Sequence, residues 1–156
     1  MAHGRVSAVI PAPSHAVFDL LHDYSRRLEW DTLLQAAYLS DGHTAAGKGV
    51  TSVCVGRRSL GSLAFKTVYV TFERPTRAAV KLINRPAWFN SWAATIQHQD
   101  LSERESRITY TFHFTVRPRI LAPLLDPLMG LIFRWETSRR LRALQRYFAR
   151  TASAPA

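Results

Sequence analysis

The sequence predicts an α+β fold in which a curved antiparallel sheet of about seven strands wraps around one long C-terminal helix. Two observations support this prediction. Strand-like runs separated by turn residues at short intervals follow one another from residue 33 to residue 116, as in an antiparallel meander. A segment with helical periodicity then extends from Pro127 to about Ala149, which is enough for a helix of roughly 35 Å.

The first thirty residues predict one strand and two short helices. Val6 to Ile10 form a strand-like run, which the prolines at positions 11 and 13 should end because proline cannot extend a hydrogen-bonded ladder. Ser14 is a suitable N-cap for a short amphipathic helix that follows. A second short helical piece should end near Trp30.

The last two strands predict one face of the interior. Apolar and polar residues alternate without a fault from Ile108 to Val116, so Ile108, Tyr110, Phe112, Phe114 and Val116 should share one face. In the preceding strand the same alternation would place Trp88, Asn90, Trp92, Ala94 and Ile96 on that face.

The long helix should begin at Asp126 and Pro127, a favoured N-cap residue followed by proline at the first helical position. A helical wheel places Phe133, Thr137, Leu141 and Leu144 on the stripe that faces the sheet. We expect residues 1–150 to form a single domain, with a disordered tail over 151–156.

Composition restricts the class of protein. The 156 residues suit one domain, and no apolar run approaches the roughly 20 residues of a membrane-spanning helix. The first residues lack the features of a secretion signal, so we expect a cytoplasmic location. Cys54 is the only cysteine, which excludes an internal disulfide and zinc sites built from paired cysteines. We expect no metal and no cofactor.

The net charge of +10 comes almost entirely from arginine. It favours acidic partners or reflects compositional bias, and because most arginines are scattered we favour the bias. Nucleic-acid binding is the weakest alternative, since no recognition-helix motif or interleaving of aromatic and basic residues accompanies the charge.

Three stretches give the chain a resemblance to a known family. They are residues 10–21 (IPAPSHAVFDLL), residues 28–31 (LEWD), and the segment from Ile108 through the helix ending at Tyr147 and Phe148. Over nearly its whole length the chain resembles the SRPBCC or START-like superfamily of polyketide cyclase/dehydrase type. The resemblance implies a helix-grip fold with an internal cavity for a lipid, polyketide, hormone or quinone-like ligand, and a tryptophan at the cavity mouth in the position of Trp30. As a lone residue, Trp30 could equally fix the two short helices to each other.

An apolar small molecule is therefore the expected partner. The faces of the predicted elements carry many aromatic residues and a few polar ones, which describes a ligand pocket better than a dry core. The expected lining comprises Trp30, Trp88, Asn90, Trp92, Tyr110, Phe112, Phe114, Phe133, Thr137 and Leu141.

No recognisable catalytic arrangement is present, so we favour a binding or carrier protein over an enzyme. The alternative is a cyclase or dehydratase that uses the same cavity. Tyr110, His98 and Asn90 would be its candidate catalytic groups.

One apolar surface of the long helix lies away from the predicted seam. Leu128, Leu131, Ile132 and Trp135 share this side, and we expect the lead-in residues Ile120, Leu121, Leu124 and Leu125 to fold back over it. If they do not, this side would suit peripheral contact with a membrane or a protein partner.

Overall fold

The structure is a computed structural model that describes residues 1–153. It confirms the predicted order of one strand, two short helices, a six-stranded meander and a long helix. The elements in chain order are β1 (Ala2–Ile10), α1 (Ser14–His22), α2 (Arg27–Trp30), β2 (Leu34–Leu39), β3 (Thr51–Gly56), η1 (Arg58–Leu60), β4 (Ala64–Glu73), β5 (Arg77–Leu82), β6 (Phe89–Ser102), β7 (Glu105–Val116), η2 (Arg119–Leu121) and α3 (Ala122–Ser153).

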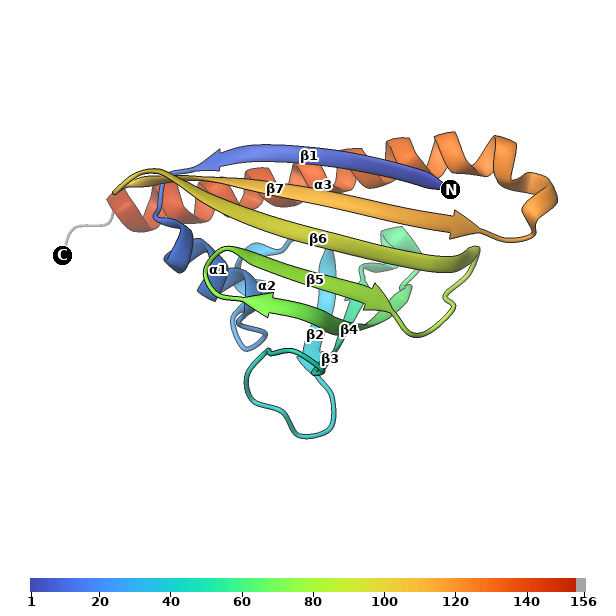
Figure 1. Ribbon diagram of the computed structural model, residues 1–156, viewed down its shortest axis with the longest axis horizontal. Coiled ribbons are helices and arrows are strands. Elements are labelled where there is room, and N and C mark those ends of the chain that lie inside the picture. The colour runs from blue at the N-terminus through green and yellow to red at the C-terminus, as the bar shows by residue number, and fades with distance from the viewer. Residues whose placement is uncertain (154–156) are drawn as a thin grey trace.

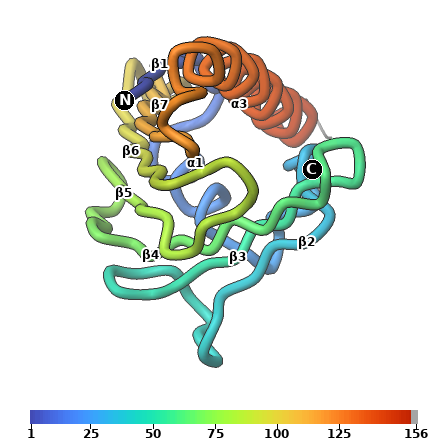
Figure 2. Tube along the Cα trace, turned by 90° about the vertical axis from the view of Figure 1, so that its right-hand side faces the viewer, coloured from blue at the N-terminus to red at the C-terminus, as the bar shows by residue number. Residues whose placement is uncertain are grey.

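The seven strands form one antiparallel sheet in the order β1-β7-β6-β5-β4-β3-β2. The long strands β1, β7 and β6 run beside α3 (Figure 1). From there the sheet curls through β5 and β4 toward β3 and β2, and α3 lies across the open side of the arc (Figure 2). The sheet therefore holds the helix along one edge and bends away from it along the other.

The alternation predicted for β7 is confirmed. Ile108, Tyr110, Phe112, Phe114 and Val116 are all buried, and Thr137, Leu141 and Leu144 of α3 are buried as well. Apolar burial of this kind stabilises the fold by about 1.5–3 kcal/mol for each large side chain. The core thus lies along the contact between the long strands and the helix.

The start of α1 differs from the sequence prediction. Ser14 is the first residue of the helix, and the N-cap position belongs to Pro13, which has no side-chain hydrogen bond to offer. Asp100 of β6 provides the cap instead, accepting hydrogen bonds from the backbone N of Ser14 at 2.7 Å and from its Oγ at 3.0 Å. A carboxylate from a distant strand thus satisfies the helix terminus, which local sequence patterns do not reveal.

The long helix also begins earlier than predicted. It starts at Ala122, directly after η2, so Pro127 lies inside it and Asp126 is not its N-cap. Proline removes one backbone donor, a loss that the helix tolerates here near its beginning. At the other end α3 continues to Ser153, so residues 151–153 of the expected disordered tail are helical. Residues 154–156 lie outside the described residues.

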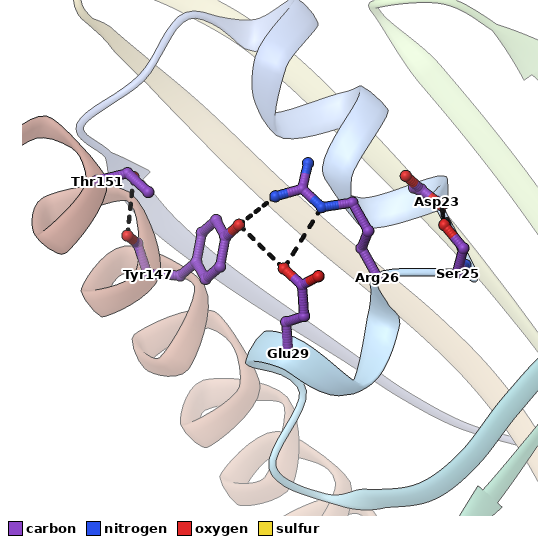
Figure 3. A network of polar contacts seen from close by, with 6 residues as sticks. All are labelled: Asp23, Ser25, Arg26, Glu29, Tyr147 and Thr151. Atoms are coloured by element: carbon purple, nitrogen blue, oxygen red, sulfur yellow. Dashed lines mark hydrogen bonds and ion pairs between the residues drawn. The ribbon is translucent and has the colours of Figure 1, made fainter. Parts of the chain in front are cut away.

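Polar contacts join α2 to the C-terminal half of α3 (Figure 3). Tyr147 donates a hydrogen bond from its hydroxyl to Glu29 at 3.2 Å and accepts one from Arg26. Arg26 also contacts Glu29, at 3.4 Å between Nε and Oε2. These contacts lie on the surface, and they fix the short helices against the helix that the sheet surrounds.

Candidate functional site

A cavity of about 310 Å³ lies between the curved sheet and α3. This volume falls within the range of small-molecule sites in proteins. Strands β2 to β7, the two short helices and the middle of α3 all contribute to its wall. Most of the lining is aliphatic or aromatic: Leu33, Leu34, Leu60, Leu63, Phe65, Val80, Phe89, Trp92, Ile96, Met129, Ile132 and Phe133.

The aromatic part of the wall gathers around Phe133 of α3. Its ring centroid lies 5.4 Å from that of Phe89, 6.4 Å from that of Phe65 and 6.4 Å from that of Trp92. The indole Nε1 of Trp92 is buried and has no hydrogen-bond partner among the described residues. This part of the cavity offers an apolar surface.

Two arginines and one aspartate form a charged cluster in another part of the wall. Nε of Arg27 and Nε of Arg140 each lie 3.0 Å from the same Oδ2 of Asp31. Both arginines line the cavity, and the side chain of Asp31 is fully buried. Burial alone would raise the pKa of Asp31, but Arg140 and Arg27 outweigh it and hold that pKa below its usual value. The aspartate is therefore a carboxylate shared by two cations.

Next to this cluster, His22, Tyr24 and Tyr69 form a hydrogen-bonded chain on the cavity wall. Nδ1 of His22 lies 2.8 Å from the Tyr69 hydroxyl, which lies 3.1 Å from the Tyr24 hydroxyl. Burial lowers the pKa of His22 well below its usual value, and burial raises the pKa of Tyr69 well above its own. All three groups are neutral at pH 7, so they can donate and accept hydrogen bonds without carrying charge.

Some of the residues expected in the lining do border the cavity: Trp92, Tyr110, Phe133 and Thr137. Three others, Phe112, Phe114 and Leu141, are buried without bordering it. Phe133 explains two of these cases, because its ring centroid lies 5.5 Å from that of Phe112 and 5.4 Å from that of Phe114. It covers them on the side that faces the cavity.

Trp88 and Asn90 lie outside the cavity because β6 contains a bulge. The register shifts between Phe89 and Ser91, so Phe89 pairs with Val116 while Trp92 pairs with Phe114. On the N-terminal side of the bulge the inward position is therefore Phe89, which takes the place that alternation assigned to Asn90. Trp88 is 56% exposed, and the side chain of Asn90 is exposed as well.

Trp30 and His98 are buried but do not line the cavity. Trp30 packs against Arg27, whose guanidinium carbon lies 4.8 Å from the centre of its ring system. His98 packs against Phe18 of α1, with ring centroids 5.4 Å apart. Of the three candidate catalytic residues, only Tyr110 therefore borders the cavity.

The sequence prediction missed most of the polar lining. Thr67 and Tyr69 alternate with outward residues along β4, so period-two alternation in that strand was a signal that could have found them. No comparable signal marks Arg27 and Arg140, because charged helical residues are normally placed in solvent. Cys54 also lines the cavity, and burial raises the pKa of its thiol, which keeps it protonated.

The apolar side of α3 is exposed. Leu131 is 67% exposed and Trp135 is 52% exposed. The prediction that the lead-in covers them is wrong, because Ile120 and Leu124 are themselves 84% and 71% exposed. The lead-in is η2 and the first turn of α3, so it extends this exposed surface instead of folding over it. Ile132 belongs both to this surface and to the cavity wall.

Within residues 1–153, no group of three His, Cys, Asp or Glu side chains is placed to hold a metal ion. Within the same residues, no helix combines the length and the apolar character needed to cross a membrane.

Comparisons with known proteins agree with this architecture. Residues 1–149 match the family described as "Polyketide cyclase / dehydrase and lipid transport". No match to the sequence was found among proteins with curated descriptions.

Solved structures with the same fold include proteins from several bacteria. The Zhui aromatase/cyclase from Streptomyces sp. R1128 has a TM-score of 0.82 at 11% identity, with 97% of this chain and 96% of that chain covered. A START superfamily protein from Mycobacterium smegmatis has a TM-score of 0.77 at 10% identity, with 97% and 99% covered. The XoxI protein from Bacillus cereus has a TM-score of 0.78 at 18% identity, with 99% and 100% covered.

At such low identities these structures establish a shared fold and nothing more. The family match spans nearly the entire chain, and the curved sheet around a long C-terminal helix is the helix-grip architecture of the START and aromatase/cyclase proteins. The chain belongs to the polyketide cyclase/dehydrase and lipid transport family.

Proposed function

We propose that the protein binds a hydrophobic small molecule, such as a lipid, a polyketide or a quinone-like compound, and carries it without transforming it. The observation that supports this most directly is the cavity of about 310 Å³ with its largely aliphatic and aromatic wall. Burying apolar ligand surface against such a wall contributes about 25 cal/mol per Å². A cytoplasmic location remains a prediction from the sequence.

The protonation states of the lining favour binding over catalysis. A general acid or base works best with a pKa near the operating pH. Here burial moves the pKa of His22 down and the pKa values of Tyr24, Tyr69 and Tyr110 up, in each case away from neutrality. Such groups can orient a ligand by hydrogen bonds while exchanging no proton with it.

Native mass spectrometry of protein purified from the expressing cells tests this proposal. We expect a species heavier than the polypeptide, whose excess mass disappears on denaturation and is recovered in an organic extract as an unmodified apolar compound. A native mass equal to the denatured mass, together with an extract free of such compounds, would contradict carriage of a cellular ligand.

A cyclase or dehydratase is the second candidate function, and the chain of His22, Tyr69 and Tyr24 is the observation that favours it. A tyrosine hydroxyl held by a histidine at 2.8 Å can donate to a carbonyl oxygen of a folded polyketide and polarise it. Recovery of a chemically altered compound after incubation with a polyketide, by wild-type protein and not by Tyr69→Phe, would favour this enzyme over the carrier.

We also propose that the exposed side of α3 rests on an anionic membrane surface when the ligand is exchanged. The apolar residues from Leu124 to Trp135 are followed on the same side of the helix by exposed Arg139, Arg142 and Arg146. An apolar stripe with adjoining arginines is suited to lipid acyl chains and phosphate groups together. Ile132 connects this stripe to the cavity wall, so a ligand would have a short apolar route between them.

Vesicle flotation tests the membrane contact. We expect the protein to float with vesicles that contain phosphatidylserine and not with phosphatidylcholine alone, and Leu131→Glu/Trp135→Glu should abolish flotation. The matched control is Tyr38→Glu/Ile83→Glu, which changes residues of 52% and 49% exposure away from α3 and should still float. Equal flotation of both double variants, or none of the wild type, would refute the contact.

A further inference from the structure

We propose that the ligand of the cavity is an amphipathic organic anion, whose acidic group is bound by Arg27 and Arg140 while its apolar body lies against Phe133. A carboxylate is the simplest group of this kind. The inference rests on the proposed function, since it names the chemical class of the molecule that the cavity holds.

The first step is the position of the two guanidinium groups. Both arginines line the cavity, and both are largely withdrawn from solvent, with side chains 9% and 20% exposed. Arginines on a cavity wall are costly to bury unless each finds an acceptor. They converge on a single carboxylate, Asp31, so the cluster carries one more positive charge than negative charge.

The second step is the number of donors that remain. A guanidinium group has five N–H bonds. Arg27 uses Nε toward Asp31 and Nη1 toward the backbone oxygen of Leu21 at 2.6 Å. Arg140 reaches Asp31 through Nε, in an ion pair outside hydrogen-bond geometry. Among residues 1–153 the other N–H bonds of this pair have no hydrogen-bonded acceptor, and a ligand carboxylate would supply two oxygens.

Among residues 1–153, Glu136 is the carboxyl side chain that lines the cavity, and it does not complete the cluster. It forms no ion pair with either arginine within the described chain, where Asp31 is their ion-pair partner. Burial raises the pKa of Glu136, against the opposite influence of Arg140 and Arg139. Because Glu136 pairs with neither guanidinium group, the free N–H bonds of Arg27 and Arg140 remain available to a ligand.

Neutral polar groups accompany the arginines on the wall. His22, Tyr69 and Tyr24 line the cavity and are joined to one another by hydrogen bonds. The aromatic region lies nearer the N-terminal end of α3 than Arg140 does. Phe133 precedes Arg140 by seven residues, which is roughly 10 Å along an α-helix. A matching ligand is charged at one end and apolar over the rest.

Calorimetric titration with decanoate and decan-1-ol at pH 7.5 tests this assignment, because the two probes differ only in the charged group. We expect decanoate to bind the wild-type protein at least about tenfold more tightly than decanol, as charge-assisted hydrogen bonds are the stronger kind. Arg140→Gln should remove this preference while leaving the decanol affinity within about twofold. Arg140→Lys keeps the charge and should keep most of the preference.

Glu136→Gln is the matched control for Arg140→Gln. It replaces a cavity-lining acidic residue of α3, whereas Arg140→Gln replaces a basic one. It should leave the decanoate preference intact or increase it, and loss of the preference in this variant would overturn the assignment to the arginines. Equal binding of both probes by the wild type, or a preference that survives Arg140→Gln, would also overturn it and leave the apolar cavity site standing. Binding of neither probe would contradict the proposed function together with this inference.

Discussion

His98 shows how far burial can shift a single titratable side chain in this protein. It is 7% exposed, lies against Phe18, and neither ring nitrogen has a hydrogen-bond partner within the described chain. Burial lowers its pKa to about 4, from the usual 6.5, and Asp100 opposes this only weakly. Between these two pH values the unfolded chain binds a proton that the folded chain does not, so stability falls as the pH falls.

We therefore expect His98 to lower the free energy of unfolding by about 3 kcal/mol as the pH is lowered from 6.5 to 4. Urea denaturation at pH 7 and at pH 4.5 would measure it. His98→Leu should reduce the pH dependence, part of which remains because the pKa of His22 is lowered in the same direction. His113→Leu, on the exposed face of β7, is the control. Identical pH dependence in wild type and His98→Leu would refute this account.

At the scale of the elements, two sets of polar contacts tie α2 to α3, and they differ in burial. Asp31, with Arg27 and Arg140, is buried, whereas Arg26 and Glu29 beside Tyr147 are about half exposed. Solvent weakens exposed charge pairs to 0–1 kcal/mol in most proteins, while breaking a buried pair costs about 3–5 kcal/mol because an uncompensated charge stays behind.

Asp31→Asn should accordingly lower the free energy of unfolding by about 3–5 kcal/mol, because two buried arginines lose their common anion. Tyr147→Phe, which removes one exposed hydroxyl from the contacts of Figure 3, should lower it by about 1 kcal/mol or less. Guanidinium denaturation of the two variants gives the comparison. Similar losses in both would show that the buried cluster is not the main attachment between these helices.

The elements also show what the sequence could and could not predict. The alternation of β7 and the α3 seam around Thr137 follow from local periodicity, and both predictions are confirmed. The bulge at Asn90 and the cap of α1 by Asp100 depend on contacts between distant segments, which local patterns do not contain. In the cavity wall the sequence predicted Trp92, Tyr110 and Phe133 and missed Phe65 and Phe89. It also missed Arg27 and Arg140, because their burial depends on a shared partner.

At the scale of the whole molecule, the fold separates helix from sheet along one side. The long strands β1, β7 and β6 follow α3, while β4, β3 and β2 curve away from it (Figure 1 and Figure 2). Interiors are normally packed to the density of organic crystals, so a void of about 310 Å³ is a costly feature unless a ligand fills it. The proposed function depends on this space.

The most direct test is to fill the cavity from its wall. Ile96 of β6 lines it, while the next residue, Gln97, is exposed on the opposite face of the same strand. An Ile96→Trp side chain should enter the open space, so the free energy of unfolding should stay within about 1 kcal/mol of wild type, and binding of the uncharged dye Nile red should weaken at least about tenfold. Gln97→Trp should bind the dye as wild type does. A destabilisation of several kcal/mol by Ile96→Trp with unchanged dye binding would contradict the cavity.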